Sequence, residues 1–204
     1  MKTQNSKKAF ILLNGTPPFQ LPNLKNYKIV CAVDGAYNHF VKSGIEPDLV
    51  TGDFDSIDNI PTHIEAINTD DQEFADFHKT LTILKERGHT NIDVYGASGQ
   101  EQDHFLGNIS TALQWKDSLN LRFFDDYGSY VFIDKKFTKS DIKGKIVSLI
   151  PFPTASGIIT KGLLYPLNNE SLTFGERIGT RNTAEEDTIE ITFNEGALLV
   201  YVGK

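Results

Sequence analysis

Residues 47–57 read PDLVTGDFDSI, a short apolar segment that ends on a glycine and two acidic residues. Leu49 and Val50 are typical of a buried strand, and Asp53 and Asp55 follow the glycine. In an extended segment, residues two apart point to the same side, roughly 6.5 Å apart, so the two carboxylates face the same way. Two carboxylates drawn to about 4 Å repel by about 4 kcal/mol at an effective dielectric of about 20. We therefore expect a cation beside them, the alternative being that Asp53 caps a turn and Asp55 is solvated.

The rest of the first half alternates strand-like and helix-like segments. Short apolar runs predict strands at 9–13, 28–33, 48–51 and 91–95. Helical periodicity, together with glycine stop signals, predicts helices at 36–43, 74–87 and 103–114. This alternation is typical of a parallel sheet covered by helices.

The pattern changes after Trp115, where short alternating runs follow one another without a convincing helix. Residues 189–193 alternate, 194–196 give a turn signal, and an apolar run ends the chain, which predicts a hairpin. These runs indicate a small antiparallel β-domain, which we interpret as a sandwich. The predicted fold class is therefore α/β, with an N-terminal parallel-sheet α/β domain at 1–117 and a small antiparallel β-sandwich domain at 118–204.

Composition argues against several classes of protein. The chain has 204 residues, of which 39% are hydrophobic and 23% charged, so it can bury a core. A net charge of −7, with no Lys/Arg cluster longer than a pair, argues against a nucleic-acid partner. The apolar run 9–13 is too short for a signal peptide or a membrane span. The single cysteine, Cys31, allows no internal disulfide, which fits a reducing compartment and predicts a cytoplasmic location.

Polar residues of the first half follow the ends of predicted strands. Asp34 and Gly35 follow one strand, Asp53 and Asp55 a second, and the small-residue loop 96–99 a third. Ligands of open parallel sheets bind at the carboxyl ends of the strands, so these segments should share one edge. Mg²⁺ usually takes one or two carboxylates together with phosphate oxygens, and a glycine-rich loop lets backbone N–H groups approach phosphate. The loop lacks the Lys-Ser/Thr of a P-loop, which disfavours a Walker-type NTPase.

Charged residues also precede or open two of the predicted helices. Asp71 and Asp76 come before Lys79, and Asp76 and Lys79 share a helix face because they are three residues apart. The alternative is that these acids only interact favourably with the positive end of the helix dipole. Asp103 opens the next helix beside His104, where an N-cap aspartate and a partly buried histidine form the plainer alternative.

Taken in order, these segments resemble the thiamine pyrophosphokinase family. The family pattern is ADGGAN, then P-D-x-x-x-GDFDS, a TD-F-x-K helix, a glycine-rich loop followed by DH, and a β-rich half that contains GTSN. The corresponding segments here are VDGAYN at 33–38, PDLVTGDFDS at 47–56, ADFHK at 75–79, GASGQEQDH at 96–104, GLLYPL at 162–167 and IGTRN at 178–182. The match runs in the same order from about residue 30 to the end of the sequence.

The resemblance implies pyrophosphate transfer from ATP to thiamine, giving thiamine diphosphate and AMP. It also implies Mg²⁺ and a homodimer that binds thiamine between the α/β half of one subunit and the β half of the other. The implied catalytic residues are Asp53, Asp55, Asp76 and Asp103, with Asp76 or Asp103 accepting the hydroxyl proton, and the implied metal ligands are Asp53, Asp55 and Asp76. The residues implied to bind ATP or thiamine are Asp34, Gly35, Asn38, Lys79, Ser98, Gly99, Thr180 and Asn182.

The sequence departs from the family pattern at several positions. Ala36 replaces the second glycine of ADGGAN, Ala75 replaces the threonine of the helix motif, and Arg181 stands where serine is common. Glu101 stands where arginine is usual, which reverses the charge in a loop expected to meet phosphate.

Two alternative functions remain open at this point. The first is a pyrophosphokinase that acts on another hydroxymethyl acceptor, such as a pterin. The second is a non-catalytic module that binds nucleotide or thiamine. A turnover assay for AMP with a panel of alcohols distinguishes all three.

Overall fold

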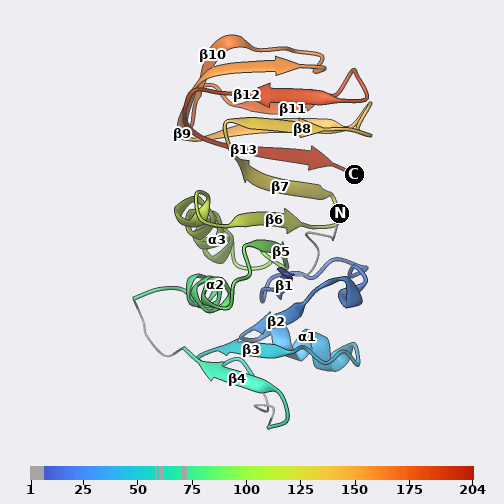
Figure 1. The fold of residues 1–204 in the computed structure, drawn as a ribbon, viewed down its shortest axis with the longest axis vertical. Helices are drawn as coiled ribbons and strands as arrows, with labels where there is room; N and C mark the ends of the chain where they lie inside the picture. Colours follow the sequence, from blue (N-terminus) through green and yellow to red (C-terminus); the bar gives the residue numbers. More distant parts are fainter. Residues whose placement is uncertain (1–6, 58, 60–61, 70–72) are drawn as a thin grey trace. The chain divides into compact units, whose positions relative to one another are not determined.

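The computed structural model describes residues 7–57, 59, 62–69 and 73–204 (Figure 1). The chain divides into two compact units, residues 1–125 and 126–204, which are described one at a time.

The first unit is built on a parallel sheet with the strand order β4-β3-β2-β1-β5-β6. The strands are β1 (Lys8–Leu12), β2 (Ile29–Val33), β3 (Leu49–Gly52), β4 (Glu65–Asn68), β5 (Asn91–Tyr95) and β6 (Asn120–Phe124). Every residue of β2 and β3 is buried. Continuous apolar strands of this kind are typical of parallel sheets that are covered on both faces.

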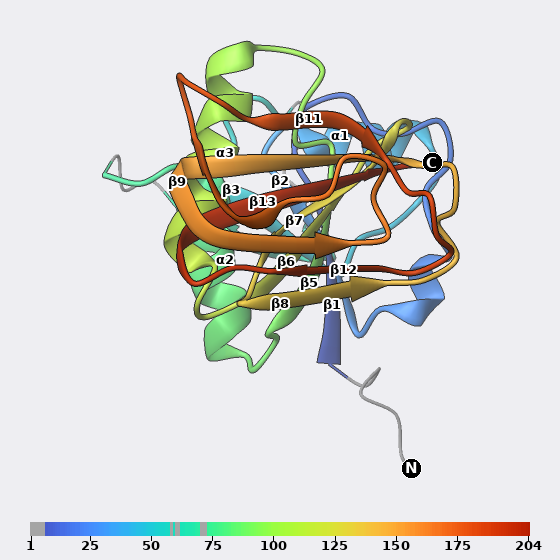
Figure 2. The ribbon, with the colours of Figure 1, turned by 90° about the horizontal axis from the view of Figure 1, so that it is seen from above.

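Helices cover the two faces of this sheet. They are α1 (Ala36–Lys42), α2 (Asp76–Glu86) and α3 (Gln102–Trp115). Phe40 of α1 belongs to the same apolar cluster as Val50, whereas Thr80 of α2 lies 2.7 Å, oxygen to oxygen, from Thr51. Successive strand residues point to opposite faces, so α1 and α2 lie on opposite sides of the sheet, as Figure 2 shows.

The second unit is an antiparallel β-domain with the strand order β7-β13-β9-β12-β8, to which β10 and β11 add by pairing with β9. The strands are β7 (Gly128–Ile133), β8 (Lys136–Lys139), β9 (Ile146–Lys161), β10 (Asn168–Thr173), β11 (Gly179–Thr183), β12 (Ile189–Thr192) and β13 (Glu195–Gly203). The long β9 pairs with different strands along its length, so the sheet folds over one apolar core that includes Val147, Ile158 and Leu198.

The predicted fold class is confirmed, since a parallel α/β unit precedes a smaller antiparallel β unit and residues 116–204 contain no helix. Two details differ from the prediction. β6 pairs in parallel with β5 and so belongs to the first unit, which places the division at 125/126 instead of 117/118. The predicted hairpin of residues 188–202 is wrong, because β9 lies between β12 and β13 in the strand order.

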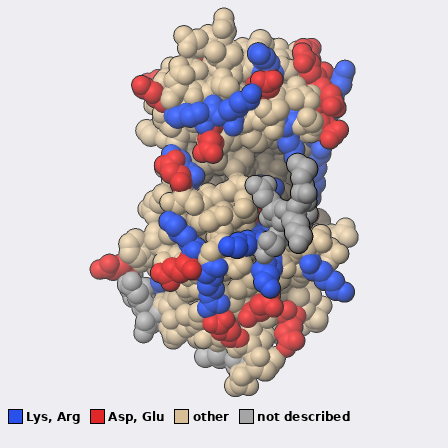
Figure 3. Space-filling model, viewed as in Figure 1, with Lys and Arg blue, Asp and Glu red and all other residues tan. Residues whose placement is uncertain are grey.

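The structure also bears on what composition predicted about membrane crossing, surface charge and the single cysteine. None of the described helices combines the length and apolar character that a membrane crossing requires. On the face drawn in Figure 3, acidic and basic side chains are interspersed. Cys31 is a buried free cysteine. The cytoplasmic location inferred from the single cysteine stays a prediction.

Candidate active site

Three carboxylates meet at the carboxyl ends of β2 and β3. Oxygen atoms of Asp34, Asp53 and Asp55 all lie within 4.8 Å of one another. The Asp34 N–H donates to the Thr51 carbonyl at 2.7 Å, which ties the two strand ends together. A β-carbon on Gly52 would lie 3.0 Å from that of Asp34, and Gly52 has a φ of 145°, so this close approach requires glycine.

The cluster carries negative charge that the described residues do not balance. Asp34 Oδ1 is buried and has no hydrogen-bond partner in the described part of the chain. Burial raises the pKa of the Asp34 carboxyl and the charges of Asp55 and Asp53 raise it further, although the nearby Gly35 backbone and Ser56 side chain oppose the rise. A hard divalent cation would satisfy the orphaned oxygen and turn the repulsion into attraction. Carboxylate oxygens are ligands that Mg²⁺ prefers, so this donor set fits Mg²⁺.

Local hydrogen bonds fix the loop that carries Asp53 and Asp55. Asp53 Oδ1 accepts from the Asp55 N–H at 3.2 Å, and Asp55 Oδ1 accepts from Ser56 Oγ at 2.8 Å. Asn38 on α1 donates through Nδ2 to the Ser56 carbonyl at 2.8 Å. Asp53 thus caps a turn and also contributes to the acidic cluster. Asn38, which the resemblance assigned to ligand binding, is placed to hold this loop.

The start of α2 carries another acid, which is paired with a lysine. Asp76 Oδ1 accepts from Thr69 Oγ1 at 2.9 Å and forms an ion pair with Lys79 Nζ at 2.8 Å. Lys79 also donates to the Thr69 carbonyl. Asp76 does not belong to the described group of three acids within 4.8 Å, so its role as a metal ligand stays a prediction. Asp71 lies outside the described residues.

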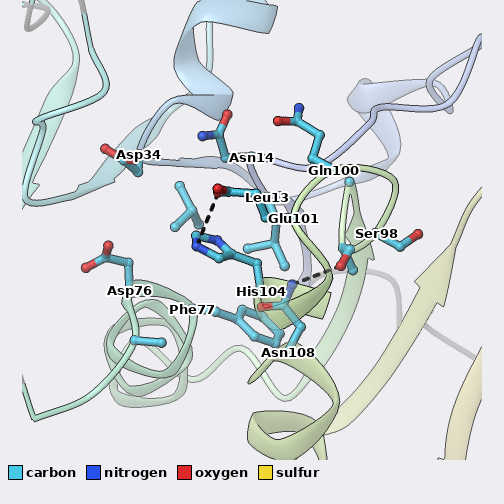
Figure 4. A pocket seen from close by; sticks show the side chains of 15 residues that line it. Leu13, Asn14, Asp34, Asp76, Phe77, Ser98, Gln100, Glu101, His104 and Asn108 are labelled. Carbon is cyan, nitrogen blue, oxygen red and sulfur yellow. Dashed lines mark hydrogen bonds and ion pairs between the residues drawn. The ribbon is translucent and has the colours of Figure 1, made fainter. Parts of the chain in front are cut away.

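A cavity of about 270 Å³ lies between the strand ends and the first turns of α2 and α3. Figure 4 shows Asp34, Asp76, Gln100 and His104 around it. Ser98 also lines the cavity. Asp34 of the acidic cluster, the lysine-paired Asp76 and the small-residue loop therefore meet around one space, as the rule for strand ends in parallel sheets predicts.

The small-residue loop after β5 is held by its neighbours. The Ala97 carbonyl accepts from Asn108 Nδ2 at 3.0 Å. The Thr16 N–H donates to the Ser98 carbonyl at 2.7 Å, and Thr16 Oγ1 donates to the Gly99 carbonyl at 2.8 Å. Three successive carbonyls are thus bonded to other segments, which fixes the position of the loop.

The first turn of α3 brings a glutamate and a histidine to the cavity. Glu101 Oε2 lies 3.7 Å from His104 Nε2, and the two side chains are 78% and 72% exposed (Figure 4). His104 is therefore exposed, contrary to the alternative that it is partly buried. Asp103 Oδ1 accepts from the His104 N–H at 2.9 Å, and the catalytic role of Asp103 stays a prediction.

The sequence reasoning missed the loop that follows β1. Asn14 and Gly15 line the cavity, and the Gly15 N–H donates to the Gly96 carbonyl at 2.8 Å. The signal was present, because Asn14-Gly15-Thr16 follows a predicted strand just as the other polar loops do. What the sequence does not reveal is that β1 and β5 are neighbours, which brings the two loops together.

Comparisons with known proteins identify the family. The family model described as thiamin pyrophosphokinase, catalytic domain, matches residues 22–123, and the model described as thiamin pyrophosphokinase, vitamin B1 binding domain, matches residues 133–198. The chain belongs to the thiamin pyrophosphokinase family. The two matched segments fall in the first and the second structural unit.

Individual members of the thiamin pyrophosphokinase family show how far the similarity extends. The Bacillus subtilis (strain 168) thiamine pyrophosphokinase is 26% identical over 208 residues, covering 95% of this chain and 97% of the relative. Thiamine pyrophosphokinase 1 of Oryza sativa subsp. japonica is 30% identical over 173 residues, a match that covers 74% of this chain and only 64% of the relative. The crystal structure of thiamine pyrophosphokinase from Bacillus subtilis superposes with a TM-score of 0.82 at 23% identity, covering 96% of this chain and 99% of that one, and so has the same fold.

The second unit holds the remaining residues that the thiamin pyrophosphokinase resemblance selected. Thr180 and Asn182 lie in β11, and Thr180 is exposed. Asn182 Nδ2 donates to the Tyr165 carbonyl at 2.7 Å, and Asn182 Oδ1 accepts from the Tyr165 N–H at 3.1 Å. Arg181 has a φ of 56°, and its N–H donates to Ser148 Oγ at 3.0 Å. Asn182 is thus placed to fix the segment around Tyr165, and ligand contact by Thr180 and Asn182 stays a prediction.

Proposed function

We propose that this member of the thiamin pyrophosphokinase family transfers a pyrophosphoryl group from ATP to thiamine, giving thiamine diphosphate and AMP. The observation that carries the proposal is the cluster of Asp34, Asp53 and Asp55, with its orphaned Asp34 oxygen, beside a cavity of the first unit. Family membership supports ATP as the phosphate donor and thiamine as the acceptor. The proposal includes Mg²⁺ as the metal cofactor, and the acidic cluster supports this choice.

The described residues have distinct roles in the proposed reaction. Asp34, Asp53 and Asp55 would hold Mg²⁺, which when bound neutralises charge on the phosphate oxygens. The thiamine hydroxyl oxygen bonds to the β-phosphorus, and the bond from that phosphorus to the oxygen bridging the α- and β-phosphates breaks, releasing AMP. Asp76 lines the cavity and is held in place by Lys79, which favours it over the exposed Asp103 as acceptor of the hydroxyl proton. Catalysis of this kind depends mainly on positioning and charge neutralisation.

Incubation of the purified protein with ATP, Mg²⁺ and thiamine tests the proposed function. We expect AMP and thiamine diphosphate to form in equal amounts, and neither to form in EDTA. The same assay with a pterin alcohol in place of thiamine tests the other-acceptor alternative. Tight nucleotide binding without any AMP would favour the non-catalytic module and contradict the proposal.

We propose further that the chain forms a homodimer through its second unit, which would bind thiamine. Large apolar side chains are exposed on this unit, including Tyr165 at 69%, Phe174 at 60% and Leu164 at 42%. A two-fold dimer would pair such surfaces with their own copies. We expect light scattering to give a dimer mass across a dilution series. A monomer with full activity would contradict a site shared between subunits.

Replacement of Glu101 tests whether this side chain faces the phosphates. Glu101 lines the cavity, so its charge should repel a bound triphosphate. We expect Glu101→Gln to tighten Mg-ATP binding about two- to fivefold at low ionic strength, with Glu101→Arg tightening it further and salt reducing both effects. Glu86→Gln, at the far end of α2, is the matched control and should change nothing. Weaker binding by both Glu101 variants would instead indicate that the contact with His104 is needed.

A further inference from the structure

The loop after β1 lies where the strand order of the first unit reverses. β2, β3 and β4 follow one another on one side of β1, whereas β5 and β6 lie on the other side. In open parallel sheets, ligands bind in the crevice at this point. Asn14, from the loop after β1, lines the cavity there, as Figure 4 shows.

The carboxamide of Asn14 lies against the backbone of Gly35. A β-carbon on Gly35 would be 2.6 Å from Asn14 Nδ2, 2.7 Å from Oδ1 and 2.8 Å from Cγ. The φ of Gly35 is −53°, an ordinary helical value that any residue adopts. A side chain at this position would therefore displace the Asn14 carboxamide, whereas the backbone conformation itself would accept any residue.

Basic side chains are scarce among the described residues that line the cavity. None of the described residues that line it is Lys or Arg. Metal ions and uncharged donors are therefore left to meet much of a triphosphate there, and Asn108 Nδ2 is already bonded to the Ala97 carbonyl. Asn14 lies over the residue that follows Asp34, and so beside the acidic cluster. Its carboxamide offers two N–H donors next to that cluster without adding charge.

We propose that Asn14 binds the phosphate chain of the nucleotide through its Nδ2 donors, and that Gly35 lacks a side chain so that this carboxamide fits. Asn14 lies outside the sequence segments that carry the family resemblance. The proposal rests on the proposed function, because it needs a Mg-bound nucleotide in the cavity.

Calorimetric titration of Asn14→Ala and Asn14→Asp tests the contact directly. The ligands are a non-hydrolysable ATP analogue and tripolyphosphate, each with Mg²⁺. We expect Asn14→Ala to weaken the binding of both about 10- to 100-fold, the range for one hydrogen bond to a charged group. Asn14→Asp has nearly the same shape but replaces the donors with a negative charge, so it should bind more weakly still.

A double-mutant cycle with Gly35→Ala tests the packing argument independently. The added methyl group displaces the Asn14 carboxamide, so Gly35→Ala should weaken binding of both ligands in the wild-type background. In the Asn14→Ala background the carboxamide is gone, and the same substitution should cost much less. Additive losses in the two backgrounds would overturn the proposed link between Gly35 and Asn14.

Asn23→Asp is the matched control, because Asn23 Oδ1 accepts from the Lys25 N–H at 3.1 Å and aspartate caps equally well. It should bind both ligands like the wild type.

Asn14 is exposed, so its variants should also melt like the wild type. A lower melting temperature would overturn the proposal in favour of a structural role. Unchanged affinity in both Asn14 variants, or loss of the ATP analogue alone, would overturn the phosphate contact and leave the proposed function standing. A wild-type protein that binds neither ligand would overturn the proposed function itself.

Discussion

Asp53→Asn and Asp55→Asn should each lower AMP production by a factor on the order of 10²–10³, the usual loss when charge stabilisation at a transferring group is removed. Each substitution removes one negative charge and keeps the side-chain shape. The asparagine Oδ1 can still accept the bonds that now fix the loop, from the Asp55 N–H and from Ser56 Oγ. The loss of activity would therefore report lost metal binding and not a collapsed turn.

Two measurements distinguish lost metal binding from a collapsed turn. They are AMP production as a function of Mg²⁺ concentration, and a thermal melt in EDTA. We expect high Mg²⁺ to recover part of the activity, and Tm in EDTA to hold or rise because repulsion within the cluster is relieved. Asp117→Asn, at an exposed site next to Lys116, is the control and should keep full activity. Near-normal turnover of both cluster variants at low Mg²⁺ would remove the metal role.

Asp34→Asn should remove most activity and should also stabilise the metal-free protein at neutral pH. Burial raises the pKa of the Asp34 carboxyl above its value in the unfolded chain, so the folded protein favours the protonated form. Ionised Asp34 therefore destabilises the metal-free fold. This destabilisation is absent below the unfolded pKa of about 4 and grows as the pH rises through the higher folded pKa.

Thermal melts between about pH 3 and pH 8 in EDTA test this prediction, starting below the unfolded pKa. The Tm values of wild type and Asp34→Asn should coincide at the acid end and separate as the pH rises, with the variant more stable. Mg²⁺ at neutral pH should raise the Tm of the wild type more than that of the variant, because binding to the folded state stabilises it. A constant difference between the two Tm curves at every pH would contradict the destabilisation assigned to ionised Asp34.

Most helices and buried strands could be read from the sequence, because their apolar periodicity is local. The exceptions have physical causes. β4 is a short edge strand with no buried residue, so it lacks the apolar alternation that marks a strand. β12 and β13 look like a hairpin, yet both pair with β9, whose place between them depends on distant residues.

The sequence by itself determined that acidic and small residues follow the strands, and hence which edge of the sheet carries the site. Asp34 belongs with Asp53 and Asp55 only because β2 pairs with β3, and the orphaned Asp34 oxygen results from burial at that junction. Asn14 reaches the cavity because β1 lies beside β5. Strand order and side-chain burial arise from contacts between residues far apart in the chain, so local pattern could name the candidate groups and only the tertiary structure could place them against one another.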